Sequence, residues 1–246
     1  MPEAVHGILF DKDGTLVDYA ATWAPINVSA ANHAAGGDAD LARKLLRIGG
    51  HDPETGRIAG GSLLAAAHTI EIAEAWRTGG STIALAELTK DLDRIFTAGA
   101  ANAVPVPQSG TFFDVLRDAG IRTGVATSDS EAGARATLSA IGLDDLVDFV
   151  AGYDSGHGGK PGPGMAHAFA KSLGLSEDDC VMVGDNLHDI RMGRAAGFSL
   201  CLGVLTGTGS REDLEPEADH VLGDVTEIPS LLEDLGRWPR ANRAKS

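Results

Sequence analysis

Two aspartates stand directly after the first apolar run of the chain, in the string FDKDGTLVD that begins at Phe10. Asp11 and Asp13 are separated by one residue, and the pair Gly14-Thr15 follows them. Open parallel sheets bind ligands at the carboxyl ends of their strands, so a ligand placed there would meet both carboxylates. Aspartate and glycine also close many strands without any chemical role. The pair by itself therefore leaves a binding site and an acidic turn equally open.

A second pair of acids follows the apolar run CVMVG. Asp185 closes this run, and Asp189 lies four residues further on, at the start of a predicted helix. Side chains four residues apart share a helix face, so both carboxylates could point at one cation. The simpler alternative is that Asp185 or Asn186 caps the helix. A cap explains one acid and leaves the second without a role.

Hydroxyl groups and a lysine complete the set of polar candidates. Thr127, Ser128 and Asp129 end a predicted strand and begin a helix, where hydroxyls and free backbone amides can bind phosphate. A Ser-Asp pair at this position is also a common helix cap. Lys160 lies in the loop GHGGKPGPG, which is too rich in Gly and Pro to be a solvated helix face. A lysine in that loop could reach an anion, although exposed loop lysines are common.

Short apolar runs predict the framework that must position these residues. Helix-like segments separate most of the runs, and Gly120 and Gly142 stop two of these segments. Alternation of buried strands with helices indicates a parallel sheet covered on both faces, which is an α/β fold of the Rossmann-like type. The predicted strands are residues 5–10, 123–127, 149–152, 180–184 and 198–205.

The interval 19–104 shows helical spacing and no convincing strand. Apolar residues recur at steps of three and four over 85–96 and again over 63–76, which gives each segment one apolar face. A Pro-Val-Pro string then predicts a stiff connector back to the sheet. We therefore expect an all-helical domain at 19–104, inserted into an α/β core formed by 1–18 and 105–246. One continuous core that contains these helices is the alternative.

Taken together, the strings resemble the four motifs of the haloacid-dehalogenase (HAD) superfamily. The set is D-x-D-G-T from Asp11, then Thr127, then Lys160 before a proline, then G-D-x-x-x-D from Gly184. The motifs occur in the family's order, each follows a predicted strand, and the likeness extends over about residues 5–222. The helical insertion resembles the C1-type cap of the phosphoglycolate-phosphatase-like branch. The resemblance implies a HAD-like α/β core with a helical cap.

The resemblance also implies a role for each motif residue. Asp11 would attack phosphorus and form an aspartyl-phosphate. Asp13 would protonate the leaving oxygen and then take a proton from the attacking water. Thr127 and Lys160 would hold the transferring phosphoryl oxygens, where charge must be stabilised. The implied phosphate-binding set is completed by Gly14, Thr15 and Ser128.

Magnesium is the implied cofactor, because Mg²⁺ takes oxygen ligands, usually one or two carboxylates together with substrate phosphate. Asp11 and Asp185 are the predicted carboxylate ligands, and the backbone carbonyl of Asp13 is the third. Asp189 would be a further ligand or a support behind the ligands. The cation would screen Asp11 from the anionic phosphate. The acid at Asp13 also favours phosphate-ester chemistry over carbon–halogen cleavage, which has no oxyanion leaving group to protonate.

The implied reaction is hydrolysis of a small phosphate monoester, phosphoglycolate-like or a sugar phosphate. Arg57 in the insertion could pair with a second anionic group of such an ester. Its basic neighbours Arg43, Lys44 and Arg47 also fit the polar face of a helix. A sugar phosphomutase of the β-phosphoglucomutase type carries the same motifs and stays open. A phospho-acceptor signalling module is a more distant alternative, disfavoured by D-x-D-G-T and by the long insertion.

Composition limits the partners. The 246 residues carry a formal net charge of −15, which disfavours a nucleic-acid partner because such binding depends on Lys and Arg. No apolar run reaches the roughly 18 residues of a membrane helix, and the N-terminal segment lacks the features of a secretory signal. Cys180 and Cys201 sit in apolar runs, which predicts buried free thiols. We expect a cytoplasmic monomer or homodimer that binds neither nucleic acid nor membrane.

Overall fold

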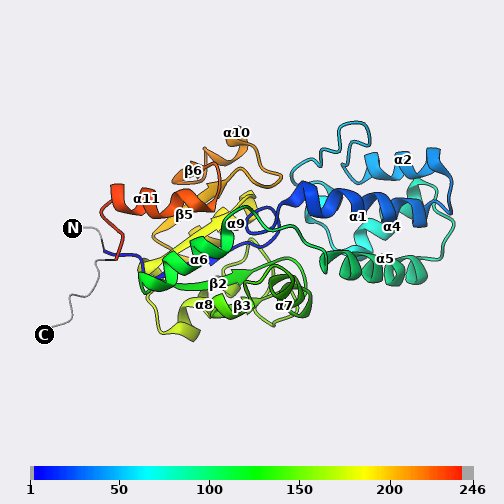
Figure 1. Cartoon of the computed structure of the whole chain (residues 1–246). Helices are drawn as coiled ribbons and strands as arrows, with labels where there is room; N and C mark the ends of the chain where they lie inside the picture. Colours follow the sequence, from blue (N-terminus) through cyan, green and yellow to red (C-terminus); the bar gives the residue numbers. More distant parts are fainter. Residues whose placement is uncertain (1–2, 240–246) are drawn as a thin grey trace, which may run out of the picture.

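The computed structural model describes residues 3–239 and contains a six-stranded parallel sheet (Figure 1). The strands are β1 (Gly7–Phe10), β2 (Arg122–Ala126), β3 (Phe149–Ala151), β4 (Cys180–Gly184), β5 (Leu200–Val204) and β6 (His220–Leu222). They lie in the order β3-β2-β1-β4-β5-β6. Strands β1 to β5 overlap the predicted runs. β6 has no counterpart among them, because its three residues are too short an apolar run to stand out.

The two neighbours of β1 end level with it. Phe10, the last residue of β1, pairs with Val125 of β2 and with Val183 of β4. The N–H of Asp11 continues the ladder and donates to the Val183 carbonyl at 2.8 Å. The residues that directly follow β1, β2 and β4 therefore meet at one edge of the sheet. Asp11, Thr127 and Asp185 directly follow these three strands, so they lie at this edge.

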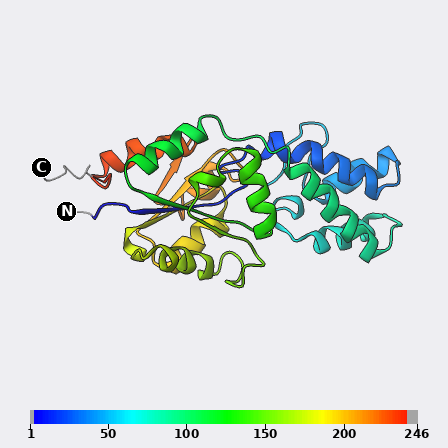
Figure 2. The same cartoon turned by 60° about the horizontal axis from the view of Figure 1, so that its bottom comes forward.

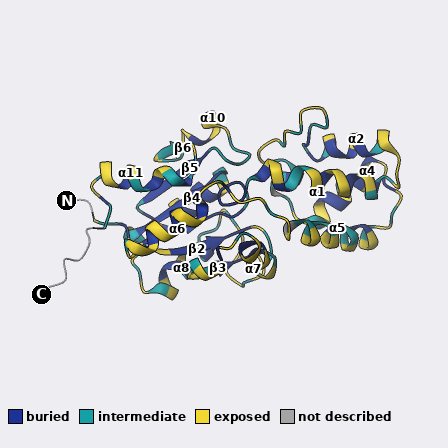
Figure 3. Cartoon of the chain, viewed as in Figure 1, coloured by how far each residue is buried: buried dark blue, intermediate teal, exposed yellow. Residues whose placement is uncertain are grey.

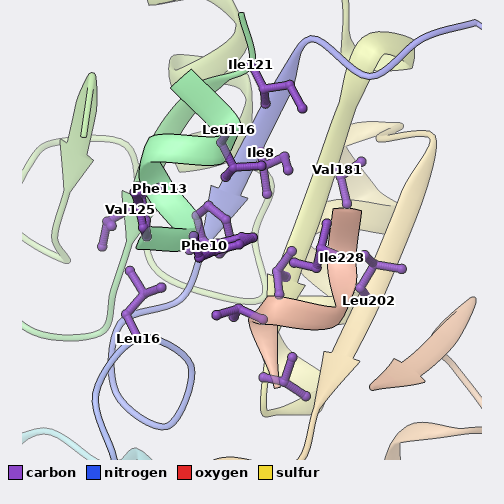
Figure 4. Packing of buried hydrophobic residues seen from close by; sticks show 14 of the residues in the cluster. Ile8, Phe10, Leu16, Phe113, Leu116, Ile121, Val125, Val181, Leu202 and Ile228 are labelled. Carbon is purple, nitrogen blue, oxygen red and sulfur yellow. The ribbon is translucent and has the colours of Figure 1, made fainter. Parts of the chain in front are cut away.

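Helices cover both faces of the sheet and bury its apolar side chains. They are α6 (Ser109–Asp118), α7 (Glu131–Ala140), α8 (Gly164–Leu173), α9 (Leu187–Ala196), α10 (Arg211–Leu214) and α11 (Ile228–Asp234). On one face, Phe113 of α6 and Ile228 of α11 join a cluster with Phe10, whose ring centroid lies 5.4 Å from that of Phe113 (Figure 4). On the other face, Phe169 of α8 and Ile190 of α9 belong to a second cluster. The predicted α/β fold is confirmed.

The helices between β1 and α6 pack against one another and lie beyond one end of the sheet (Figures 1 and 2). They are α1 (Tyr19–Ala34), α2 (Ala39–Ile48), α3 (Leu63–Ala66), α4 (Thr69–Gly79) and α5 (Leu85–Ala100). Trp76, Leu88 and Leu92 are fully buried in a hydrophobic cluster that these helices share. Figure 3 shows exposed residues on their outer surfaces and buried ones inside. The helix predicted from the spacing over 85–96 is α5.

The single helix predicted over 63–76 is wrong, because the chain divides it into α3 and α4. Ala67 and His68 are extended, with ψ values of 159° and 154°. The Glu71 side chain accepts a hydrogen bond from the His68 N–H at 2.8 Å and so caps the start of α4. Ile70 consequently leaves the apolar face and is 50% exposed.

Both cysteines are free and buried, as predicted. Burial raises the pKa of Cys180 to about 12 and that of Cys201 to about 11, so both thiols stay protonated at neutral pH. Within residues 3–239, no helix is both long enough and apolar enough to cross a bilayer.

Candidate active site

A small cavity of about 70 Å³, which we call the inner pocket, opens at the edge where β1, β2 and β4 end. Most of its lining comes from the residues that follow these three strands, from the loop before α8 and from the first turn of α9, and Tyr19, Ala65 and Thr208 complete it. Residues far apart in the sequence meet in it, and most of the predicted site is among them. The predicted residues that line the inner pocket are Asp11, Asp13, Thr127, Ser128, Lys160, Asp185 and Asp189.

Lys160 is the cation at the centre of the inner pocket. Its Nζ donates to Asp11 Oδ1 and, at 2.5 Å, to Asp189 Oδ1, and its side chain is 3% exposed. Burial by itself would lower the pKa of Lys160, but the charges of Asp11 and Asp189 outweigh burial and raise it. Lys160 therefore stays protonated at neutral pH. It supplies a fixed positive charge and cannot serve as a proton donor that titrates there.

Asp189 holds Lys160 from the first turn of α9. One carboxylate oxygen pairs with the Lys160 ammonium, and the other accepts the N–H of Asn186 at 3.1 Å. The Asn186 side chain accepts the His188 N–H at 3.2 Å and caps the helix, as the alternative reading of this string predicted. Capping therefore accounts for Asn186, while Asp189 still points into the pocket.

The carboxylates of Asp11, Asp185 and Asp189 lie within 4.8 Å of one another, and all three are buried. Burial, opposed by Lys160 and reinforced by the other acids, raises the pKa of Asp11 well above its ordinary value. Burial and then Asp189 raise the pKa of Asp185 to about 7. Buried like charges disfavour each other unless a cation accompanies them, and Lys160 supplies one charge against three. Clustered carboxylate oxygens are the donors that Mg²⁺ prefers, so these residues fit the implied cofactor.

The Gly-rich stretch after β5 fixes Asp185 in place. Thr208 donates its N–H at 2.7 Å and its hydroxyl at 3.2 Å to Asp185 Oδ2. A Cβ at Gly207 would lie 2.0 Å from the same oxygen, so a side chain there would displace the carboxylate. The prediction from sequence does not include Thr208. Two glycines flanking it just beyond a strand end are the signal that could have indicated it.

Asp13 points away from the acidic cluster and toward α1. Its Oδ1 accepts the indole N–H of Trp23 at 2.8 Å, and its Oδ2 lies 2.7 Å from the ammonium of Lys12. Lys12 is fully buried, and its ammonium also lies 3.4 Å from Asp129 and 5.8 Å from the Trp23 ring. The prediction from sequence omits Lys12 and Trp23. The lysine between two aspartates was the available signal, whereas nothing in the sequence marks the tryptophan.

Thr127 and Ser128 face the inner pocket at the end of β2. The Thr127 hydroxyl accepts the N–H of Asp129 at 3.1 Å. Ser130 is the cap of α7, because its hydroxyl accepts the N–H of Gly133 at 3.1 Å. Ser130 therefore caps the helix, which was the simpler interpretation of this string. The hydroxyls of Thr127 and Ser128 do not serve as this cap and line the pocket instead.

Gly14, Thr15 and Arg57 do not line the inner pocket. Gly14 has a φ of +89°, and a Cβ there would lie 2.7 Å from Asp185 Oδ2, so it lets the loop pass close to that carboxylate. Thr15 is fully buried, and its hydroxyl has no hydrogen-bond partner among the described residues. Arg57 is exposed. The side chains of Thr15 and Arg57 therefore lie outside the inner pocket, and Gly14 contributes only the close approach of its backbone to Asp185.

A larger cavity of about 600 Å³, which we call the outer pocket, adjoins the inner one. Its lining comes from α1, α5 and the break between α3 and α4 on one side, and from α7 and the loops after β2 and β3 on the other. Helices α5 and α7 contact each other. The two pockets share Asp13, Tyr19, Ala65, Ser128 and Asp129.

Aromatic rings and acids characterise the outer pocket. The Trp23 ring centroid lies 6.4 Å from that of Tyr19 and 6.1 Å from that of Phe96. His68 from the α3–α4 break lies 5.6 Å from Tyr153, centroid to centroid. Within the described part of the chain, no Lys or Arg lines this cavity. Its acids are Asp13, Asp93 and Asp129.

The parallel sheet, the cluster of acids at its edge and the lysine beside them form a site on an α/β core, arranged as in the family whose motifs the sequence resembles. Residues 5–197 match the model of a family of hydrolases described as haloacid dehalogenase-like hydrolase. That match covers more than half of the chain, so the chain belongs to the haloacid dehalogenase-like hydrolase family.

Individual relatives carry different names. The chain is 38% identical over 97 residues to a phosphoglycolate phosphatase of Rhodospirillum rubrum, covering 39% of this chain and 40% of that protein. It is 34% identical over 122 residues to the tyrosine-protein kinase PtkA of Mycobacterium tuberculosis, which covers 49% of this chain and 41% of that protein. Each match spans less than half of the relative's length. The fold is shared with CbbY from Rhodobacter sphaeroides, whose structure was solved in complex with phosphate, with a TM-score of 0.63 and 21% identity. The superposition covers 91% of this chain and 96% of CbbY.

Proposed function

We propose that this protein is a magnesium-dependent phosphatase that hydrolyses a phosphate monoester through an aspartyl-phosphate on Asp11. The observation that carries the proposal is the inner pocket itself, in which Lys160 bridges Asp11 and Asp189 beside a third buried acid, Asp185. Membership of a hydrolase family supports the same reaction class. A buried carboxylate next to a fixed cation is suited to attack an anionic phosphoryl group that the cation helps to hold.

Each polar side chain of the inner pocket has a proposed role. Asp11 attacks phosphorus, and the resulting aspartyl-phosphate is hydrolysed by water. Asp13, on the side of the outer pocket, donates a proton to the leaving oxygen and later takes one from that water. Lys160 and the hydroxyls of Thr127 and Ser128 hold the phosphoryl oxygens. Gly14 and Thr15 contribute through the shape of the loop and not through side-chain contact.

Asp11 and Asp185 would hold Mg²⁺, together with the backbone carbonyl of Asp13. The ion would supply the positive charge that screens the Asp11 carboxylate from the phosphate. We assign Asp189 to the support of Lys160, because both of its carboxylate oxygens already accept hydrogen bonds. Thr208 keeps Asp185 oriented toward Asp11.

We propose that residues 19–104 act as a cap domain on a core formed by 1–18 and 105–246. The two connections between them run side by side, because the Asp18 N–H donates to the Val104 carbonyl at 2.8 Å and the Val106 N–H to the Leu16 carbonyl at 2.9 Å. Paired connections of this kind form a hinge about which the helices could open and close over the pockets.

A sugar phosphomutase is disfavoured by the charge of the outer pocket. A mutase must hold a second phosphoryl group while it returns the first, and such a group calls for Lys, Arg or another cation. The described lining of the outer pocket contains neither Lys nor Arg. Water is therefore the acceptor that we propose for the aspartyl-phosphate.

The proposal is tested by phosphate release from a panel of small phosphate esters, with magnesium and with chelator. We expect release to need magnesium and to fall on the order of 10⁴-fold or more in Asp11→Asn, because the nucleophile is lost. Asp114→Asn, an exposed change of the same type on α6, is the matched control and should keep full activity. Release that survives chelation or the loss of Asp11 would contradict the proposal.

A further inference from the structure

The outer pocket bears on which ester the protein accepts. The inner pocket, at about 70 Å³, is far smaller than the outer one, at about 600 Å³. The larger volume lies within the range of roughly 300–1,000 Å³ that is usual for ligand pockets. Since the two cavities share Asp13 and Ser128, a phosphoryl group in the inner pocket places the rest of the ester in the outer pocket. The chemistry of the outer pocket therefore selects the leaving group.

The aromatic wall of the outer pocket is held in a fixed arrangement. Trp23 is anchored by the hydrogen bond from its indole N–H to Asp13, 2.8 Å long. Its ring contacts those of Tyr19 and Phe96, at centroid distances of 6.4 Å and 6.1 Å. Rigid aromatic surfaces bind flat apolar groups through area burial and through offset or edge-to-face contacts. This wall is suited to an aromatic leaving group.

Charge in the outer pocket acts against an anionic leaving group. Asp93 and Asp129 line it, and no Lys or Arg does within the described residues. Lys12, the cation paired with Asp13, is fully buried and does not line the cavity. A carboxylate placed here would lose its hydration without gaining a Lys or Arg partner, and it would also face the two acids. The small glycolate group of phosphoglycolate would in addition leave most of the volume unfilled.

From these observations we propose that the substrate is a phosphate monoester with a bulky, aromatic and non-anionic leaving group, and that phosphoglycolate is a poor substrate. This inference rests on the proposed phosphatase function and adds the substrate class to it. Phe96, Trp23 and Tyr19 recognise the aromatic group, while Asp93 and Asp129 reject anions.

The first experiment compares kcat/KM for benzyl phosphate, 4-carboxybenzyl phosphate, ethyl phosphate and phosphoglycolate in the presence of magnesium. The two benzyl esters have nearly the same size and differ in one negative charge. We expect benzyl phosphate to exceed 4-carboxybenzyl phosphate and phosphoglycolate by about tenfold or more, since burial of an unpaired carboxylate is disfavoured. The kcat/KM of ethyl phosphate should lie below that of benzyl phosphate and above those of the two carboxylate esters, because its ethyl group carries no charge but fills little of the outer pocket.

Two variants test whether the outer pocket causes the preference. Phe96→Ala should reduce the ratio of benzyl to ethyl phosphate by about tenfold, because it removes part of the aromatic wall. Asp93→Lys should raise the ratio of 4-carboxybenzyl to benzyl phosphate several-fold, because it places a cation in the cavity. Val28→Ala is the matched control, since Val28 is exposed on α1 and lines neither pocket. Circular dichroism of each variant verifies folding.

A binding measurement makes the inference independent of turnover. Benzylphosphonate and phosphonoacetate are not hydrolysed, and calorimetry on the wild-type protein with magnesium should show tighter binding of benzylphosphonate by about tenfold. Preference for phosphoglycolate, 4-carboxybenzyl phosphate or phosphonoacetate would overturn the inference while leaving the phosphatase intact. Failure to release phosphate from any ester would contradict the proposed function, and the two phosphonates would then decide the inference alone.

Discussion

The inner pocket holds charged side chains in fixed pairs, whereas the outer pocket presents aromatic rings and carboxylates around a larger space. In the inner pocket, Lys160 is 3% exposed and bridges two acids, and Thr208 donates two hydrogen bonds to Asp185. In the outer pocket, Tyr153 is 51% exposed and Ile70 is 50% exposed. The inner pocket therefore holds its charges in fixed positions, whereas the outer pocket provides a large apolar surface that a ligand of matching shape could cover.

This difference separates two kinds of functional change. In the proposed reaction, residues of the inner pocket contact the phosphoryl group that every ester shares, so their loss should slow all substrates by the same factor. In the same proposal, residues of the outer pocket contact the part that differs between esters, so their loss should change the order of preference among esters. Uniform and selective effects are therefore the two outcomes to measure.

The largest effect outside the nucleophile is expected at Lys160. Lys160→Met removes the fixed cation that we assign to the phosphoryl oxygens, and kcat/KM should fall by about 10²–10³-fold. The factor should be equal for benzyl, ethyl and sugar esters, as measured by phosphate release. Lys171→Met, at an exposed position in the last turn of α8, is the control. A loss of kcat/KM that differs tenfold among esters would show that Lys160 also contacts the leaving group.

A smaller effect is expected at Gly207, which lies against the proposed metal ligand Asp185. In Gly207→Ala the added Cβ would lie 2.0 Å from Asp185 Oδ2, so the carboxylate must move. We expect the magnesium concentration for half-maximal activity to rise about tenfold, because the ligand geometry is disturbed. Gly110→Ala on α6 meets open space and should leave that concentration unchanged. Unchanged magnesium dependence in Gly207→Ala would argue against Asp185 as a ligand.

A change in the pH dependence of stability is the next effect in size. Without metal, burial and Asp189 raise the pKa of Asp185 to about 7, so the folded state holds this proton more tightly than the unfolded chain does. Stability from this group is therefore lost as the pH rises from about 4 to about 7. In the presence of a chelator, the Tm of the wild type minus the Tm of Asp185→Asn should decrease as the pH rises from about 4 to about 7. Magnesium should remove the decline, and parallel Tm curves in chelator would contradict the assigned cause.

The sequence predicted the inner pocket because its residues occur in short strings at strand ends. Asp11, Thr127 and Asp185 each follow an apolar run, and parallel strands that end level bring such residues together. Lys12 belongs to the same string, but a lysine between two acids is usually a solvated counter-charge, so its type and position do not predict a buried site residue. Its complete burial depends on packing under α1, which the string does not encode.

The outer pocket could not be predicted in the same way. Trp23, Phe96 and Tyr153 come from three separate segments, and each has the appearance of an ordinary packing residue in its own segment. The break that brings His68 to the cavity is also hidden, because the apolar spacing continues through Ala67 as if the helix were unbroken. Helical periodicity reports which face is apolar, but it does not report where a side-chain cap ends one helix and begins another.

The smallest effect is expected at Arg57, the residue of the proposed cap domain that the sequence predicts to pair with an anionic group of the ester. Arg57 is exposed and lines neither pocket, while its basic neighbour Arg47 pairs with Glu54 at 2.5 Å on the surface. Arg57→Ala should therefore change KM for benzyl phosphate and for phosphoglycolate by less than about twofold, as is usual for exposed positions. Arg43→Ala, on the exposed face of α2, is the control. A selective rise in KM for phosphoglycolate would mean that the loop carrying Arg57 moves over the site when an ester binds, and the outer pocket would then have a source of positive charge that its present lining lacks.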